Sequence, residues 1–416
     1  MCAQSCQQGL LCSIATVSVE ANVSYRLAHR LRDMQTLPYV VVTNPHMSHV
    51  YELYYKAFET LRRVREIKTV EDNDNYCKVI SSTLQEHLTV IPRLAMGVLE
   101  CQDLMLREEM DKFMNTLLRS VRPVILSPLD CQSLIPSFSQ RISRRVIAEQ
   151  HLALTETFNA PWYFPDAKID VESNADFVGE VFLRCNAKEV VERCGNTTQA
   201  LAREAYGVDS PVPNIELQGH LDATFPYILS HLEYIIGELL RNSIQAVVER
   251  QRDMPGEPPP IEVLICEAPQ HVIIRISDQG GGAPREILPH LWSFSKGPRS
   301  QTRLRNLLQV PKMAATMQEL KVGDVLGDDK EKSTGNADDI EKSVKPLNSS
   351  LSSLTSRPPN LRLGMGLPMS RVYAEYWAGS LELHSLEGYG VDAFLQISKL
   401  GNKNEQLSTR ASMDAV

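Results

Sequence analysis

Long apolar runs, paired cysteines and an excess of positive charge are all missing from this chain of 416 residues. No apolar stretch approaches the length of a membrane-spanning helix, so we expect no such span. The formal net charge is −8 and no basic stripe dominates, which argues against nucleic acid as a partner. The nine cysteines are scattered and none forms a Cys-x-x-Cys pair. The sequence therefore offers neither a zinc cage nor a disulfide framework, and it indicates a reducing compartment.

Charge is also scarce at the start of the chain. Glu20 is the first charged residue and Arg26 the first basic one. The apolar stretch GLLCSIATVSV could be the core of a signal peptide but lacks a basic flank, and it is not rich in arginine as a mitochondrial presequence would be. We therefore leave residues 1–23 unassigned, without a convincing targeting signal.

Residues 24–206 have the pattern of a helical domain. Apolar residues recur at three- and four-residue spacing, which predicts helices over 24–34, 46–64, 77–102, 108–120, 141–158 and 187–207. The last of these ends at Gly207, a typical helix terminator. Short connections between long helices favour an antiparallel bundle.

One segment, residues 121–140, does not fit the helical pattern. It carries three prolines and interrupts what would otherwise be a continuous helix from 108 to 158. We interpret it as an insert that extrudes from the bundle. Its ends are compatible with a translated, unspliced intron, so the sequence leaves open whether the mature protein contains it.

From residue 207 the pattern changes to strands mixed with helices. Alternating apolar residues predict strands over 261–266, 271–278, 380–387 and 390–398. Residues 310–360 are rich in serine, lysine, aspartate and asparagine, and predict a disordered insert. The expected fold class is α+β: the helical bundle, then an α/β sandwich over 207–399 with a mixed sheet and helices on one face, then a tail over 400–416.

The helix predicted over 231–250 carries two polar residues on its apolar stripe. Glu238 and Asn242 lie one turn apart there, and a carboxylate and an amide beside a buried stripe destabilise a fold unless something binds them. An exposed asparagine and a surface Glu–Arg pair are the simpler interpretations of these residues taken singly. An amide oxygen is also a suitable Mg²⁺ ligand, so Asn242 is a candidate metal site.

Three glycine-rich segments follow this helix. In Asp278-x-Gly280-x-Gly282, the aspartate ends a predicted strand on its apolar side and the glycines let the backbone approach a ligand. Gly364-x-Gly366 leads into an amphipathic helix, whose first N–H groups suit a phosphate. Gly388-x-Gly390 is a tight turn between two strands. Each segment alone is most often a simple turn, but all of them in this order favour a nucleotide.

The series formed by these glycine-rich segments and Glu238-x-x-x-Asn242 resembles the four sequence boxes of the GHKL ATPase superfamily. Within it, the segments RLAHRLRDM, EQHLAL, ELLRNSIQAV and RVYAEYWAGSLELHSLEGYG are similar to the mitochondrial 2-oxoacid dehydrogenase kinases, and most to the branched-chain type. Tyr234 supports that type, because the pyruvate dehydrogenase kinases carry histidine there. The resemblance spans residues 24–120, 141–300 and 361–398.

The resemblance implies roles for individual residues. Glu238 would be the general base for a substrate serine, and His151 on a bundle helix would be its partner. Asn242 would hold Mg²⁺ and Asp278 would bind adenine. The implied ATP-binding residues are Glu238, Arg241, Asn242, Asp278, Gly280, Gly282, Ser295, Lys296, Gly364, Met365, Gly366 and Leu367. Arg241 replaces the family's lysine, and Val391 replaces a threonine that contacts the nucleotide.

The implied function is that of a protein serine kinase that uses ATP and Mg²⁺. It would phosphorylate, and so inactivate, the dehydrogenase alpha subunit of a mitochondrial 2-oxoacid dehydrogenase complex, with the branched-chain complex favoured and the pyruvate complex second. The implied partners are that subunit and the lipoyl-bearing acyltransferase core, with a homodimer in the mitochondrial matrix. The alternative is an inactive or histidine-directed GHKL nucleotide-binding regulator. Gyrase-like and chaperone ATPases need a large domain after the last strand, where barely twenty residues follow.

Overall fold

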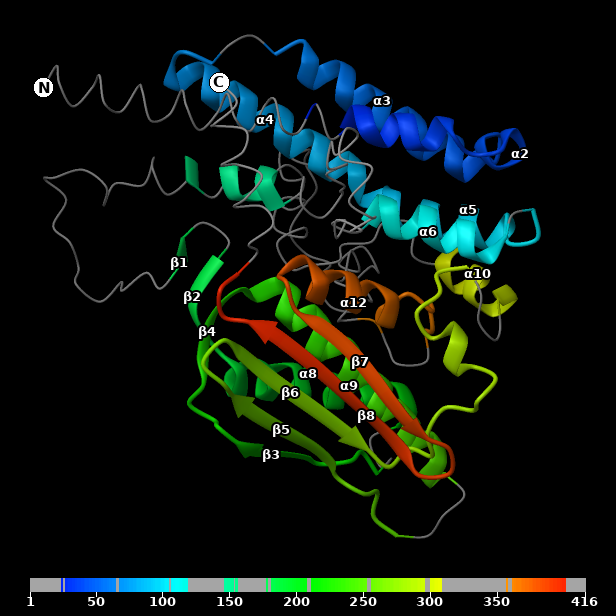
Figure 1. The fold of residues 1–416 in the computed structure, drawn as a ribbon, viewed down its shortest axis with the longest axis vertical. Helices are drawn as coiled ribbons and strands as arrows, with labels where there is room; N and C mark the ends of the chain where they lie inside the picture. The colour runs from blue at the N-terminus through cyan, green and yellow to red at the C-terminus, as the bar shows by residue number, and fades with distance from the viewer. Residues whose placement is uncertain are drawn as a thin grey trace, which may run out of the picture.

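In the computed structural model, a helical region is stacked on an α/β sandwich (Figure 1). The structure describes residues 24, 27–64, 67–104, 106–118, 146–152, 154–155, 177–178, 181–207, 211–252, 256–295, 300–308, 357 and 361–401. The unassigned start over 1–23 and the expected insert at 121–140 lie outside these residues, and so does the stretch 310–360 apart from Arg357. No helix within the described ranges is long and apolar enough to cross a membrane.

Helices make up the amino-terminal region. They are residues 27–35, α2 (Tyr39–Val42), α3 (Pro45–Arg62), α4 (Val70–Glu86), the 3-10 turn η1 (His87–Thr89), α5 (Val90–Glu100), α6 (Arg107–Leu118) and residues 146–152. The Asn44 side chain caps α3, and Thr69 forms a capping box with Asp72 at the start of α4. α5 is buried along most of its length and packs against α3. The expected helical region is confirmed, although η1 breaks the single helix expected over 77–102.

A five-stranded mixed sheet forms the next layer. Its order is β3 (Ile215–Gly219), β5 (Ile261–Glu267), β6 (His271–Asp278), β8 (Gly390–Ser398) and β7 (Ser380–Leu386). β3 is parallel to β5, and the other neighbours are antiparallel. Burial alternates along β5 and β6, because successive side chains of a strand point to opposite faces. The four strands expected from the sequence are confirmed, each to within one residue at its ends.

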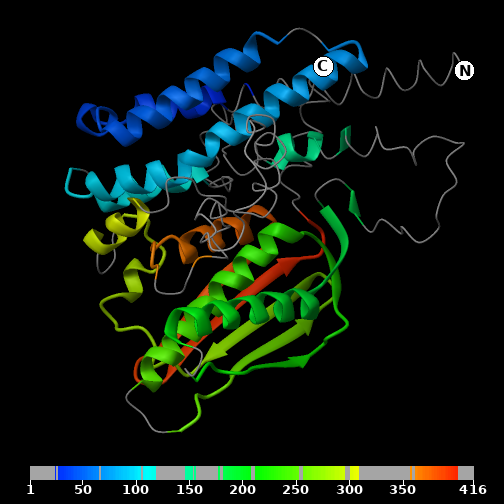
Figure 2. The same cartoon turned by 180° about the vertical axis from the view of Figure 1, so that it is seen from behind.

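Helices cover one face of this sheet (Figure 2). α9 (Leu229–Gln251) lies against β6, and α12 (Gly366–Tyr376) lies against β7 and β8. A smaller antiparallel sheet of β1 (Phe177–Val178), β2 (Val181–Asn186) and β4 (Thr224–Ile228) adjoins them.

The helix expected over 187–207 is present, but its expected place in the helical bundle is wrong. This helix, α8 (Ala187–Tyr206), follows β2 directly and packs along α9, where the Cys194 thiol and the Arg193 guanidinium contact Glu233. It therefore lies with the sheet and not in the bundle. The reason is tertiary, because an amphipathic helix buries its apolar stripe equally well against a helix or a sheet layer.

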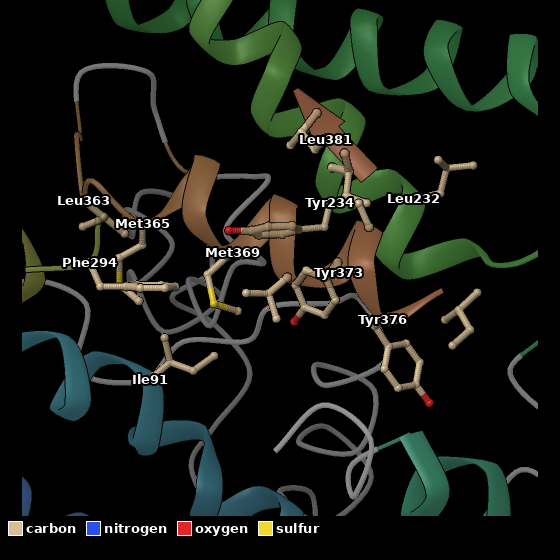
Figure 3. Close-up of a cluster of buried hydrophobic side chains, with 14 of the residues drawn as sticks. Ile91, Leu232, Tyr234, Phe294, Leu363, Met365, Met369, Tyr373, Tyr376 and Leu381 are labelled. Carbon is tan, nitrogen blue, oxygen red and sulfur yellow. The ribbon is translucent and has the colours of Figure 1, made fainter. Parts of the chain in front are cut away.

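The two regions meet through apolar side chains. Figure 3 shows Ile91 of α5 pointing toward Phe294, with Leu363 and Met365 around the same ring, and all four are buried. α10 (Ser300–Leu308) also lies against α5, and η3 (Leu288–His290) precedes it in the chain (Figures 1 and 2). These contacts hold the helical region against loops of the sandwich.

Candidate functional site

A pocket of about 830 Å³ opens between α9 and the glycine-rich loops of the sandwich. We call it the α9 pocket. Of the residues expected to bind ATP, those lining it are Glu238, Arg241, Asn242, Gly280, Gly282, Gly364, Gly366 and Leu367. The structure thus brings three separate sequence segments to one cavity.

Glu238 lies at the base of the α9 pocket and has no exposed surface. Its Oε2 accepts a hydrogen bond from Arg357 Nη2 at 2.7 Å, and its Oε1 lies 3.6 Å from Arg241 Nε. Oε1 accepts no hydrogen bond from any residue that the structure describes. One carboxylate oxygen is therefore anchored, and the other is buried beside the Arg241 guanidinium without a hydrogen bond.

Asn242, one turn further along α9, is exposed and lines the pocket. The two polar residues of this helix thus differ in environment. Glu238 is buried in an ion-pair cluster, and the Asn242 amide faces the cavity. An exposed amide oxygen at this position can take a hard cation as ligand.

Arginines give the pocket a positive charge. Six arginines line it, namely Arg241, Arg250, Arg252, Arg303, Arg357 and Arg362, against the two glutamates Glu238 and Glu249. Burial, followed by the charge of Arg357, lowers the pKa of Arg241 to about 10, and the Glu238 carboxylate opposes this shift. Arg241 therefore stays protonated at neutral pH. A basic cavity in an acidic protein attracts anions.

Asp278 lies directly behind the pocket lining. It is 5% exposed, and its Oδ1 accepts from the Gly280 N–H at 2.9 Å while its Oδ2 accepts from the Ser243 hydroxyl at 2.9 Å. Burial raises the pKa of this carboxyl, and these hydrogen bonds partly offset the shift. The backbone of Val391 also donates a hydrogen bond to this carboxyl, so of its roughly four acceptor positions one remains for a ligand amino group.

Arg250, near the end of α9, joins two of the glycine-rich loops. Its guanidinium donates to the backbone carbonyl of Gln279 at 2.7 Å and to those of Tyr389 and Gly388 at 2.8 and 3.0 Å. Gly281 pairs with the same hairpin through its N–H and its carbonyl. The Gly388-x-Gly390 turn thus braces the loop after Asp278 and does not itself line the pocket.

Four expected site residues lie away from the pocket or outside the described residues. Ser295 is buried against Asp111 of α6, and Met365 faces the apolar junction (Figure 3). His151 is buried with its ring 5.5 Å from Tyr76, and burial lowers its pKa. Among the described residues, the ion pairs and hydrogen bonds of Glu238 go to Arg241 and Arg357, and His151 does not line the pocket. Lys296 lies outside the described residues.

Sequence reasoning missed Arg357, Arg250 and Arg303. Arg250 lies eight residues after Asn242 and so on the same face of α9, which is a signal that could have identified it. Arg357 and Arg303 have no such local signal, because they reach the site from segments outside the recognisable motifs.

A nucleoside triphosphate with its metal ion fits this lining. The arginines suit the phosphates, and Asn242 is the residue that would hold Mg²⁺. No cluster of three or more His, Cys, Asp or Glu residues in the described chain could hold a metal ion by itself.

A substitution at Gly366 tests the position of the Glu238 carboxylate. A Cβ at Gly366 would lie 2.1 Å from Glu238 Oε2, and the fully buried carboxylate has no space to retreat. We expect Gly366→Ala to lower kcat by roughly 100-fold, the scale of a misplacement of about 1 Å in an active site. Activity assays on the full chain measure this. On a Glu238→Asp background, whose side chain is shorter, the same alanine should cost much less, and an equal loss in both backgrounds would contradict the contact.

Comparison with known proteins adds to this geometry. Residues 3–121 match the family described as mitochondrial branched-chain alpha-ketoacid dehydrogenase kinase. The chain is 31% identical to pyruvate dehydrogenase (acetyl-transferring) kinase 2, mitochondrial, of Saccharomyces cerevisiae, over 94% of this chain and 77% of that protein. It is 26% identical to the pyruvate dehydrogenase (acetyl-transferring) kinase, mitochondrial, of Arabidopsis thaliana, over 92% of this chain and 84% of that protein. It is also 26% identical to the human isozyme 3, over 91% and 76%. All three relatives are named as mitochondrial kinases.

Proposed function

The chain belongs to the mitochondrial pyruvate dehydrogenase kinase family of the GHKL superfamily, and from this membership we propose that it phosphorylates serine on the alpha subunit of a mitochondrial 2-oxoacid dehydrogenase complex, with ATP as phosphoryl donor. Phosphorylation would inactivate that subunit. The chain is thus a mitochondrial kinase by family, as the names of its relatives state. The substrate residue, the subunit and the complex are the parts that we propose.

The observation that carries the proposal is the pairing of Glu238 with Asn242 in the α9 pocket. A fully buried carboxylate with one oxygen that accepts no hydrogen bond and an exposed amide lie one helical turn apart along the lining of one basic cavity. This is what phosphoryl transfer to a hydroxyl requires, because a base must accept the hydroxyl proton and a metal must be held beside the phosphates.

We propose a separate role for each residue of the site. Glu238 Oε1 would accept the proton of the substrate serine. Asn242 would hold Mg²⁺, which when bound with ATP would neutralise charge on the phosphate oxygens. Arg241 and Arg357 carry positive charge beside Glu238, so a bound triphosphate would compete with the carboxylate for Arg357. The buried Asp278 would accept from the adenine amino group.

The branched-chain complex is the first substrate that we propose, and the pyruvate complex the second. Residues 3–121 match the branched-chain kinase family, and Tyr234, buried one turn before Glu238, is the residue that resembles that type. The three relatives that match over at least 91% of this chain carry the pyruvate dehydrogenase name. Docking on the lipoyl-bearing acyltransferase core, homodimer formation and a matrix location complete the proposal.

One assay tests the proposed reaction and substrate. The full chain is incubated with Mg²⁺, labelled ATP and each purified complex in turn, and phosphate on the alpha subunit is measured together with dehydrogenase activity. We expect acid-stable phosphoserine and loss of activity, faster with the branched-chain complex. ATP binding without transfer to either complex would favour the inactive regulator. Acid-labile phosphate would favour a histidine-directed enzyme.

Asp278 gives a prediction about nucleotide choice. Asp278→Asn keeps the size of the side chain but replaces an acceptor oxygen with a donor, so affinity for ATP should fall by about 1–3 kcal/mol, the cost of an unmatched buried hydrogen bond. Inosine triphosphate lacks the adenine amino group, so its affinity should change much less. Calorimetric titration of the wild type and the variant with both nucleotides measures this difference. An equal loss of affinity for ATP and for inosine triphosphate would mean that Asp278 stabilises the loop that follows it and does not bind the adenine ring.

A further inference from the structure

Asp111 of α6 crosses from the helical region to a loop of the sandwich. Its carboxylate lies 2.7 and 2.9 Å from the hydroxyl of Ser293, and it accepts from the backbone N–H of Phe294 at 3.1 Å. It also accepts from the hydroxyl and the backbone N–H of Ser295 at 3.2 and 3.4 Å. Both serines are buried, so these charge-assisted bonds form away from water, where they are strong.

Arg303 of α10 connects this loop, residues 293–295, to the loop that contains Gly364 and Gly366. Its Nη2 donates to the carbonyls of Phe294 and Gly364, each at 3.1 Å, and its Nε donates to that of Leu363 at 3.2 Å. Burial lowers the pKa of Arg303 and the Asp111 carboxylate opposes this shift, so the two charges act on each other across the loop.

Gly364 fits closely against this guanidinium. Its φ is +70°, and a Cβ there would lie 2.1 Å from Arg303 Nε. The conformation of the loop and the position of the arginine therefore depend on each other.

We propose that Asp111 and Arg303 form a relay that positions the Gly364–Gly366 loop, so that the helical region sets the affinity of the α9 pocket for ATP. The proposal rests on the proposed function, because it takes ATP as the ligand. Asp111 holds residues 293–295, Arg303 ties that loop to Leu363 and Gly364, and the next turn begins α12 at the pocket. Asp111 is not among the residues that line the pocket, so it acts as a positioning residue.

Polar contacts of this kind have an effect that the apolar junction lacks. The packing of Ile91, Phe294 and Met365 in Figure 3 brings the regions together, but apolar contacts are non-directional and allow a loop to slide. One carboxylate that accepts hydrogen bonds from two consecutive N–H groups and two hydroxyls fixes the loop at one position. A partner bound to the helical region could then alter ATP affinity through α6, and ATP would alter affinity for the partner by the same factor.

The test begins with Asp111→Asn in the full chain, which keeps the size of the side chain and removes its charge. We expect the Kd for ATP, measured by calorimetry, and the KM for ATP to rise roughly 10-fold, within the usual range of coupling between sites. The kcat at saturating ATP should stay unchanged, as expected when only binding is altered. The matched control is Glu109→Gln, an exposed residue of α6, which should leave both values unchanged. Ser295→Ala, which removes one of the contacts and does not line the pocket, should give a smaller loss in the same direction.

A double-mutant cycle distinguishes the relay from separate effects. Lysine at position 303 cannot reach three carbonyls as a guanidinium does, so Arg303→Lys should also weaken ATP binding. If the two residues act in series, the double variant binds ATP no more weakly than Arg303→Lys alone. Losses that multiply would overturn the relay, and so would Asp111→Asn behaving like Glu109→Gln. A fall in kcat and thermal stability together with affinity would overturn it as well, because that pattern indicates a general structural role. A wild-type chain that binds no ATP would instead contradict the proposed function.

Discussion

Replacing Glu238 with glutamine should lower the rate of phosphoryl transfer to the proposed substrate, the dehydrogenase alpha subunit, by roughly 10²- to 10⁴-fold, the usual contribution of general base catalysis. Glutamine keeps the shape and an acceptor oxygen for Arg357, which donates to Glu238 Oε2 at 2.7 Å. It loses the ability to take a proton. It also leaves Arg241 and Arg357 without a negative partner, so the pocket becomes more basic and ATP should bind at least as well as before. Single-turnover assays and calorimetry on the same preparation measure the two effects.

Two outcomes would contradict the proposal that Glu238 is the general base. Transfer at the wild-type rate by Glu238→Gln would mean that another group accepts the proton. A loss of ATP binding equal to the loss of rate would mean that the ion-pair cluster is structural, because removing one partner from a buried pair destabilises the site around it. Glu238→Asp is the matched variant, since it keeps the charge and should retain more activity than glutamine.

Replacing Asn242 with alanine should weaken binding of ATP in the presence of Mg²⁺ by roughly 10- to 100-fold, the scale seen when groups that support a metal site are lost. Asn242 is exposed into the α9 pocket, so its removal leaves the surrounding packing largely unchanged. Because a protein ligand is missing, additional Mg²⁺ should not restore full activity. Titration with ATP at several Mg²⁺ concentrations measures the effect.

The matched variant for this position is Asn242→Asp. A carboxylate is also an oxygen ligand for Mg²⁺, so this variant should recover metal-dependent binding better than alanine. With the metal removed by a chelator, the wild type and Asn242→Ala should bind ATP alike. A difference that persists without metal would show that the amide contacts the nucleotide and does not act as a metal ligand.

Much of the fold follows from local pattern. The strands β5, β6, β7 and β8 agree with the sequence to within a residue, because the alternation of apolar side chains and the glycine turns that bound it are local properties. The glycine-rich segments and the polar residues Glu238 and Asn242 on α9 are likewise recognisable from local sequence spacing. Their spacing indicates a close backbone approach wherever they lie, and eight of the twelve residues expected to bind ATP line one pocket.

The partners of these residues depend on contacts between segments far apart in the chain. Arg357 reaches Glu238 across 119 positions, and Asp111 reaches Ser293 across 182, so no local pattern predicts either pair. Likewise α8 lies along α9, although its sequence equally suits a bundle. Local periodicity determines which face of an element is apolar. The element or charge that meets that face is selected by the free energy of the whole packed chain, which here places Arg357 beside Glu238 and Asp111 beside Ser293.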